Sequence, residues 1–256
     1  MIDSARKHLE EGISRIINTD SIDKKIEDTA SLYVECFEME LEKIKKFGQQ
    51  ERVSYITGLR NGRLQGTDKG LREARKRTNE KVSSLLNALY DGAKNMEEEP
   101  KREIYAPVNK IRGMLMLRES ITGGKESPIE KDLEKRIPEI SVKSQGKHAD
   151  VRYLTDLYTA CYSDCFGNAI ESIRAMAEVN QKAVYDIGES FGRVQYFFKE
   201  RNSAMLSLSE QIKQLLTEVD VAVRNLQPEQ KQKIYMATNS IRLALSPDKY
   251  WPVSRQ

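Results

Sequence analysis

The sequence is poor in the residues that interrupt or cross-link a chain. Its 256 residues include only 7 Pro, 14 Gly and 3 Cys, and aromatic residues make up 7%. The longest run without a charged residue is Val82–Tyr90, about half of the ~20 residues that a membrane-spanning helix needs. The first twenty residues carry charges at helical intervals, unlike a secretory signal, and the chain has no Asn-x-Ser/Thr sequon. We therefore expect a cytoplasmic chain with reduced thiols and no transmembrane segment.

Neither sign of charge dominates the sequence. Lys and Arg number 42 against 39 Asp and Glu, which gives a net charge of +3. This balance is unlike that of an acidic solvating tail or of a histone-like polycation. Charged residues nevertheless make up 32% of the chain, and the mean hydropathy is −0.63. Such a composition is typical of long amphipathic helices with wide solvated faces.

Proline positions divide the chain into helical stretches, because Pro inside a helix removes a hydrogen bond and clashes with the preceding turn. Residues 1–99 and 139–227 contain none. In the second stretch, apolar residues recur every eleven and then every seven positions: Leu154, Cys165, Met176, Ile187, Phe198, Met205, Ile212, Val219 and Leu226. This spacing places them on one helix face. The sequence predicts an all-α protein, an elongated antiparallel helical bundle with long coiled-coil-like helices. It leaves open whether residues 151–226 form one helix or two.

Composition also indicates how the chain is organised. We expect an N-terminal helical half at 1–120, a linker at 121–150, a C-terminal half of long helices at 151–246 and a tail at 247–256. The linker has two prolines and three glycines. It should contain a short helix that begins at the capping sequence after Ser127 and ends before Pro138.

No residue pattern indicates catalysis, a cofactor or a metal. The two histidines, His8 and His148, belong to no His-Glu-x-x-His spacing. Cys161 and Cys165 share one helix face, but they fall on the apolar stripe, where a free Cys behaves as a small buried hydrophobe. Cys36 has the same character. We therefore expect a non-enzymatic protein with no catalytic, cofactor-binding or metal-binding residues.

Residues 58–81 combine glycine with positive charge. Gly58, Gly62, Gly66 and Gly70 recur every four residues. A helix would present them on one smooth face that permits close backbone approach, at a cost of roughly 1 kcal/mol each relative to Ala. That cost favours a flexible basic loop. The basic residues of the segment are Arg60, Arg63, Lys69, Arg72, Arg75, Lys76, Arg77 and Lys81.

Two interpretations of these cations remain open. A basic, Gly-rich segment follows phosphates with its side chains and its free N–H groups, which predicts a polyanion site for nucleic acid or, as a third choice, for an anionic membrane surface. Residues 20–42 contain eight acidic residues against two lysines. Pairing between the two segments would neutralise both, because charge runs on helices are more often paired than functional.

Apolar helix faces favour a role in protein contacts. Long helices with stripes wider than one neighbour covers indicate an oligomer or a hetero-complex, and Tyr250 and Trp251 are residue types that interfaces favour. Our hypothesis is a helical scaffold or assembly subunit that acts through protein–protein contacts. The alternative is a sequence-nonspecific nucleic-acid-binding subunit that uses residues 58–81.

Overall fold

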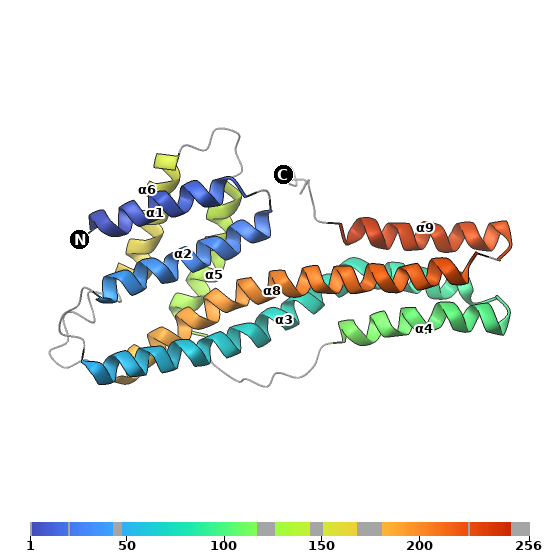
Figure 1. The fold of residues 1–256 in the computed structure, drawn as a ribbon, viewed down its shortest axis with the longest axis horizontal. Helices are drawn as coiled ribbons and strands as arrows, with labels where there is room; N and C mark the ends of the chain where they lie inside the picture. The colour runs from blue at the N-terminus through green and yellow to red at the C-terminus, as the bar shows by residue number, and fades with distance from the viewer. Residues whose placement is uncertain are drawn as a thin grey trace. The chain divides into compact units, whose positions relative to one another are not determined.

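Helices make up the described part of the chain in the computed structural model (Figure 1). The structure describes residues 2–19, 21–42, 48–116, 126–143, 151–167, 181–224 and 226–246. The helices are α1 (Ile2–Ile17), α2 (Ile22–Glu42), α3 (Gln49–Ala93), α4 (Glu98–Leu115), α5 (Pro128–Lys143), α6 (Val151–Tyr162) with a π-helical turn η1 (Ser163–Gly167), α8 (Gln181–Ala222) and α9 (Pro228–Ala244). These residues contain no strand. The prediction of an all-α helical bundle with long helices is confirmed.

The helices gather into two compact units. Unit 1 comprises Met1–Gly70 with Ser120–Asn202, and unit 2 comprises Leu71–Glu119 with Ser203–Gln256. Helices α3 and α8 each pass from unit 1 into unit 2. Each unit has its own apolar core. The expected division of the chain into consecutive halves and a linker stays a prediction.

The core of unit 1 is rich in aromatic side chains. Phe37 of α2 meets Phe191 of α8 edge to face, with ring centroids 4.3 Å apart, and lies 6.1 Å from the ring of Tyr55 of α3. Tyr33 of α2 and Tyr158 of α6 are also 6.1 Å apart. Offset aromatic pairs of this kind add to the free energy of apolar burial. Within unit 1 they join short helices to both long ones.

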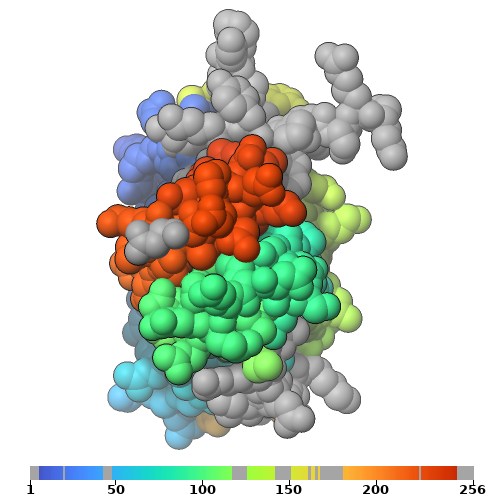
Figure 2. Space-filling model, turned by 90° about the vertical axis from the view of Figure 1, so that its right-hand side faces the viewer, coloured from blue at the N-terminus to red at the C-terminus, as the bar shows by residue number. Residues whose placement is uncertain are grey.

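Unit 2 consists of two helical hairpins. Short connections after Ala93 and Ala222 make α4 an antiparallel neighbour of α3, and α9 of α8. Pro228 stands in the first turn of α9, where its missing N–H is not needed. The Tyr90 ring stacks on that of Tyr105 at 3.9 Å. Figure 2 shows the side of this unit on which α4 and α9 face the viewer.

The chain contains an internal repeat that our sequence analysis missed. Four sequence patterns occur twice in the same order, one for each helix of the repeat. They are Leu-Glu-x-x-Ile-x-x-Ile (9–16 and 133–140), Tyr-x-x-Cys-Phe (33–37 and 162–166), Tyr-x-x-Gly-x-x-x-Gly-Arg-x-Gln (55–65 and 185–195) and Ile-Tyr-x-x-x-Asn-x-Ile-Arg-x-x-Leu (104–115 and 234–245). The first half of the chain, α1 to α4, therefore matches the second half, α5 to α9.

Helix bounds and burial agree with the repeat. Helix α3 matches α8, and α4 matches α9, at a separation of 130 residues, as in the pairs Tyr55 and Tyr185 or Ile104 and Ile234. Equivalent positions are buried together in unit 2, in the pairs Val82 and Ile212, Leu86 and Leu216, Leu89 and Val219, Ile111 and Ile241, and Leu115 and Leu245. Equivalent residues are thus buried in the core of unit 2 in both halves of the chain. We call the two halves repeat 1 and repeat 2.

The structure corrects two sequence predictions about local structure. Residues 58–81 lie inside α3, so the predicted flexible basic loop is wrong. The cost of four helical glycines is offset by a close contact with α8, described below. The helix expected after Ser127 does not end before Pro138, because α5 continues to Lys143 with Pro138 inside it. Along residues 181–222, α8 is a single helix.

Candidate functional site

Helices α3 and α8 touch backbone to backbone along their glycines. A Cβ added to Gly58 would lie 2.1 Å from the Tyr185 carbonyl oxygen, and one added to Gly62 would lie 1.8 Å from that of Glu189. Cβ atoms added to Gly66 and Gly70 would lie 2.3 and 2.6 Å from the carbonyl oxygens of Arg193 and Phe197. No side chain fits at such distances, so glycine is required here. Because the residue numbers rise together on both helices, α3 and α8 run parallel to each other in unit 1.

The repeat makes this contact reciprocal. Gly188 and Gly192 of α8 are the equivalents of Gly58 and Gly62, and their added Cβ atoms would lie 2.4 and 2.2 Å from the carbonyl oxygens of Tyr55 and Leu59. Each helix therefore offers glycines to the backbone of the other. Residues directly before and after a glycine flank this contact on opposite sides, and residues two positions away point outward.

On the first side of the pair, polar residues of α3 that precede a glycine bind α8 and α5. Asn61 donates to the Tyr185 hydroxyl at 2.5 Å, and Gln65 donates to Glu189 at 2.8 Å. Lys69 continues this row, and its ammonium lies 5.0 Å from the Phe197 ring.

Helix α5 and the residues just before it close the first side with three glutamates at every fourth position, Glu126, Glu130 and Glu134. Lys69 Nζ lies 2.8 Å from Glu126 and 2.5 Å from Glu134, and 3.7 Å from the fully buried Glu130. Arg193 of α8 lies 3.2 Å from Glu130. Lys69 of α3 and Arg193 of α8 thus bind the short helix α5 through its glutamates.

Burial sets the protonation of this cluster. Burial lowers the pKa of Lys69, but its hydrogen bonds to Glu126 and Glu134 outweigh that effect and leave the pKa raised. Loss of solvation raises the pKa of Glu130 and of Glu134, whereas the hydrogen bond from Lys69 lowers the pKa of Glu126. Neither carboxylate oxygen of Glu130 has a hydrogen-bond partner among the described residues. Its ionised form therefore rests on ion pairs alone.

On the second side of the pair, the equivalent positions carry a partly exposed cationic and aromatic surface. Arg63 is the equivalent of Arg193, and Lys199 is the equivalent of Lys69. The Arg63 guanidinium lies 5.2 Å and the Lys199 ammonium 5.1 Å from the centroid of the Tyr196 ring. Arg63 also donates to Gln195 at 3.4 Å. Lys199 is exposed, whereas its equivalent Lys69 is covered by α5.

The outward faces of the two helices differ in the same way. Val53, Ile56 and Leu64 of α3 are 58, 53 and 69% exposed. On α8, the equivalent of Leu64 is Val194, which is 2% exposed and belongs to the core that α8 shares with the short helices. Arg60 is exposed, whereas its equivalent Ser190 is buried. Unit 1 covers α8 at Ser190 and Val194 and leaves the equivalent residues of α3, Arg60 and Leu64, exposed.

The structure places the eight predicted cations on α3, but it does not make them alike. In unit 1, Lys69 binds α5 and Arg63 lies against Tyr196. In unit 2, Arg77 pairs with Glu73 at 2.7 Å on its own helix. Arg72 and Lys81 also interact with other residues. The remaining three, Arg60, Arg75 and Lys76, make no ion pair within the described part of the chain.

Charge pairing between α2 and α3 occurs at two places among the interactions described. Glu42 at the end of α2 pairs with Arg52 near the start of α3, outside residues 58–81. Arg63 is close enough to Glu38 of α2 to oppose the rise in the pKa of Glu38 that burial causes. A different acid of α2, Asp23, pairs at 2.9 Å with Arg201 of α8. The glutamates that hold Lys69 come from α5, which the sequence analysis treated as part of a linker.

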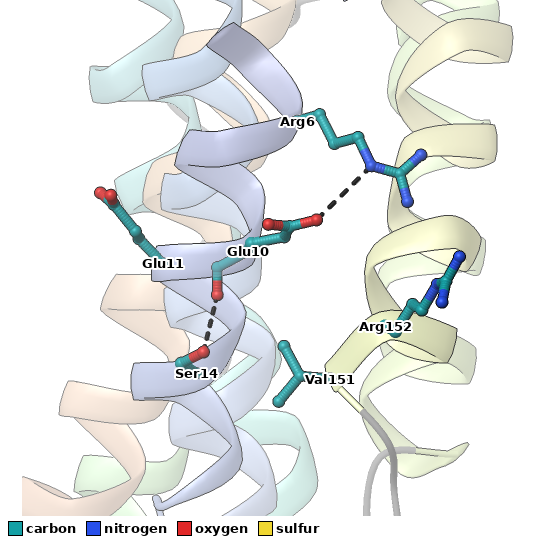
Figure 3. A pocket seen from close by; sticks show the side chains of 6 residues that line it. All are labelled: Arg6, Glu10, Glu11, Ser14, Val151 and Arg152. Atoms are coloured by element: carbon teal, nitrogen blue, oxygen red, sulfur yellow. Dashed lines mark hydrogen bonds and ion pairs between the residues drawn. The ribbon is translucent and has the colours of Figure 1, made fainter. Parts of the chain in front are cut away.

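A hollow of about 630 Å³ between α1 and α6 is open to solvent (Figure 3). Its lining residues are Arg6, Glu10, Glu11, Ser14, Val151 and Arg152. Arg6 pairs with Glu10 at 3.5 Å and with Asp156 at 2.7 Å. The Ser14 hydroxyl donates to the Glu10 carbonyl at 2.8 Å. The polar groups of Arg6, Glu10 and Ser14 are therefore bound to other protein groups.

The other sequence candidates offer no chemistry in the described residues. Cys36 is buried, and loss of solvation raises the pKa of its thiol to about 12. His8 lies 3.1 Å from Glu35. The residues that the structure describes bring together no metal-binding group of three His, Cys, Asp or Glu side chains. Their helices include none with the length and apolar character to span a membrane.

Three predictions fall outside the described residues or side chains. His148, Tyr250 and Trp251 lie outside the described residues, and the side chains of Cys161 and Cys165 are not described. Partner docking by the tail therefore stays a prediction.

Comparison with known proteins identifies no relative. The chain matches no protein-family model, no curated protein and no solved structure.

Proposed function

We propose that the protein is a non-enzymatic scaffold or assembly subunit that binds other proteins through its long helices. The observation that carries this proposal is the exposed apolar outward face of α3, formed by Val53, Ile56 and Leu64. Exposed apolar residues that are grouped on one helix face mark contact sites more often than scattered ones do. The repeat strengthens the argument, because the α8 equivalent of Leu64, Val194, is buried in an interface within the chain.

The packing of α3 supports the same role. Its glycines fix it to α8 by direct backbone contact, and Asn61 and Gln65 add hydrogen bonds on one side. A helix held this firmly presents its outward face without the entropy loss that a mobile segment would suffer on binding. Exposed aliphatic side chains on a rigid helix are typical of helix-to-helix docking.

Photo-crosslinking in cells tests the proposal. Leu64 is replaced by the photoreactive amino acid benzoylphenylalanine, and Gln214, an exposed polar residue of α8, is replaced in a control variant. We expect a discrete cross-linked species from position 64, identified by mass spectrometry, and none from position 214. The absence of a discrete species at position 64, or the same products at both positions, would refute the proposal.

A second candidate function is sequence-nonspecific binding of a polyanion. Arg60, Arg75 and Lys76 favour it, because they make no ion pair within the described residues. Phosphate contacts by such cations would give salt-dependent affinity for nucleic acid or for anionic membrane. Anisotropy titrations with single-stranded RNA, duplex DNA and anionic vesicles across a salt series test this function. Binding that is lost in a variant with all three residues changed to Glu would establish it.

A further inference from the structure

We propose that the surface formed by Arg63 and Lys199 on the second side of the α3–α8 pair, and by Arg60 and Leu64 on the adjoining outward face of α3, is a docking site for an acidic amphipathic helix of the α5 type. The inference rests on the proposed function and names the kind of partner. It follows from comparing the two repeats residue by residue.

Helix α5 shows how such a helix binds. It carries Glu130 and Glu134 next to the buried Leu133 and Ile137, and Glu126, two residues before the helix, continues the same four-residue spacing. The glutamates meet one lysine and one arginine, one from each long helix, at the distances given above. Ser127, at the start of α5, lies 3.0 Å from Ser190 on the outward face of α8. A helix therefore binds here by an acidic stripe flanked by apolar residues.

The second side has the matching cations in the matching places. Lys199 of α8 is the equivalent of Lys69, and Arg63 of α3 is the equivalent of Arg193. At the position of Ser190, α3 has Arg60, which adds a third cation, and Leu64 supplies the apolar contact that Val194 supplies on α8. Arg60 and Lys199 make no ion pair with a described residue. Charge complementarity therefore selects an acidic helix as the occupant.

Helix α1 is the equivalent of α5, yet its charges do not fit this site. In the positions of Glu126, Glu130 and Glu134 it has Ile2, Arg6 and Glu10. An arginine in place of Glu130 would face Arg63, and like charges repel. In the structure, α1 packs against α2 and α6, and Arg6 pairs with Asp156 of α6. Helix α1 thus lacks the acidic stripe of α5, and Arg60 and Lys199 remain for a helix from another chain.

The test measures fluorescence anisotropy of a labelled peptide with the sequence of residues 126–143, titrated with the full chain. We expect saturable binding that weakens as salt rises. A variant with Arg60→Glu and Lys199→Glu should bind about tenfold more weakly, because two attractive charge pairs become repulsive. The matched control, Lys233→Glu on the exposed face of α9, should change affinity less than about twofold.

A charge-swapped peptide sharpens the test. With Glu126 and Glu134 each changed to Lys and Glu130 kept opposite Arg63, the peptide should lose binding to the wild-type chain and regain it with the double variant. If the peptide instead displaced the chain's own α5, the Arg60→Glu and Lys199→Glu substitutions would not change its affinity, because α5 binds Lys69, Arg193 and Ser190.

Three results would overturn the inference. They are no saturable binding of the peptide, binding that the double variant leaves unchanged, and binding of single-stranded DNA in place of the peptide that is lost in the same double variant. A cross-link from position 64 to a partner without an acidic helix would overturn this inference alone and leave the proposed function in place.

Discussion

Gly62 is the position at which α3 and α8 come closest. An added Cβ would lie 1.8 Å from the Glu189 carbonyl oxygen and 2.9 Å from the Arg193 nitrogen, and both are backbone atoms that cannot turn away. Even a methyl group must therefore push the helices apart. Gly113 of α4 gives the opposite case, because nothing lies within 4 Å of the place where its Cβ would be. One residue type thus has two different roles in the same chain.

We expect Gly62→Ala to destabilise the protein by about 2–3 kcal/mol, the upper part of the range for overpacked sites. Thermal unfolding followed by circular dichroism should show a Tm lower by about 4–12 °C. Gly113→Ala is the matched control and should raise the Tm by about 2–4 °C, since Ala favours the helix by up to about 1 kcal/mol. Equal effects of the two substitutions would contradict the close contact.

The charge of Glu130 makes stability depend on pH. Burial raises its pKa above the ordinary value of 4.5, so the folded state binds a proton that the unfolded state has already released. The cost of the buried carboxylate is absent below pH 4.5 and appears as the pH rises through the raised pKa. We therefore expect Glu130→Gln to raise the Tm by about 2–4 °C at pH 8 and to have no effect at pH 4.

Removal of the partner should act in the opposite direction. Arg193→Met leaves Glu130 with only Lys69, 3.7 Å away, and should destabilise the protein by about 3–5 kcal/mol at pH 8. Urea unfolding of both variants at the two pH values provides the measurement. A Glu130→Gln variant less stable than wild type at pH 8 would show that the ion pairs outweigh the desolvation cost.

At the scale of elements, the existence of the helices was readable from the sequence, and their contacts were not. Proline-free stretches and apolar spacing predicted long helices, and Pro228 marked the start of α9. The loop prediction at residues 58–81 failed because helix propensity describes a glycine in an isolated helix. In this structure the glycines of the segment pack directly against the backbone of α8, which offsets their low propensity. The helix after Ser127 extends past Pro138, which shows that a proline need not end a helix whose apolar face is buried.

The outward faces of α3 and α8 give an element-scale prediction. Leu64→Asp should change the free energy of unfolding by less than about 0.5 kcal/mol, because Leu64 is 69% exposed. Val194→Asp, at the equivalent position, should destabilise by more than about 3 kcal/mol, because it buries a charge in the core of unit 1. Chemical denaturation of the two variants checks the difference. Similar losses would mean that something covers both faces.

At the scale of the whole molecule, the repeat was present in the sequence but hidden by the way the sequence was searched. Heptad and eleven-residue spacings describe one helix, whereas the repeat of the Tyr-x-x-Gly-x-x-x-Gly-Arg-x-Gln pattern at 55–65 and 185–195 relates two helices 130 residues apart. The candidate site could not be read from charge alone, since Lys69 and Lys199 are the same residue type. Their difference arises from α5, whose place only the structure shows.

The repeat leads to a prediction about the divided chain. Units 1 and 2 both draw on α3 and α8, so each unit needs helices from both repeats. Two polypeptides made by a break within residues 117–125 should therefore co-purify as a one-to-one complex when expressed together, and each alone should fail to unfold cooperatively. Size-exclusion chromatography with light scattering and thermal melts test this. Independent cooperative unfolding of either half would contradict it.

The parallel glycine contact also bears on how far the long helices can slide. Glycines recur every four residues on α3, so a shift of α8 by about one helical turn would again set Gly188 and Gly192 against small backbone positions. The glycines therefore permit several discrete registers of α8 along α3. Hydrogen bonds along the two sides of the contact favour one register. They join Asn61 to Tyr185, Gln65 to Glu189 and Arg63 to Gln195. The register of the two helices therefore depends on these three pairs together with α5, which binds Lys69 of α3 and Arg193 of α8.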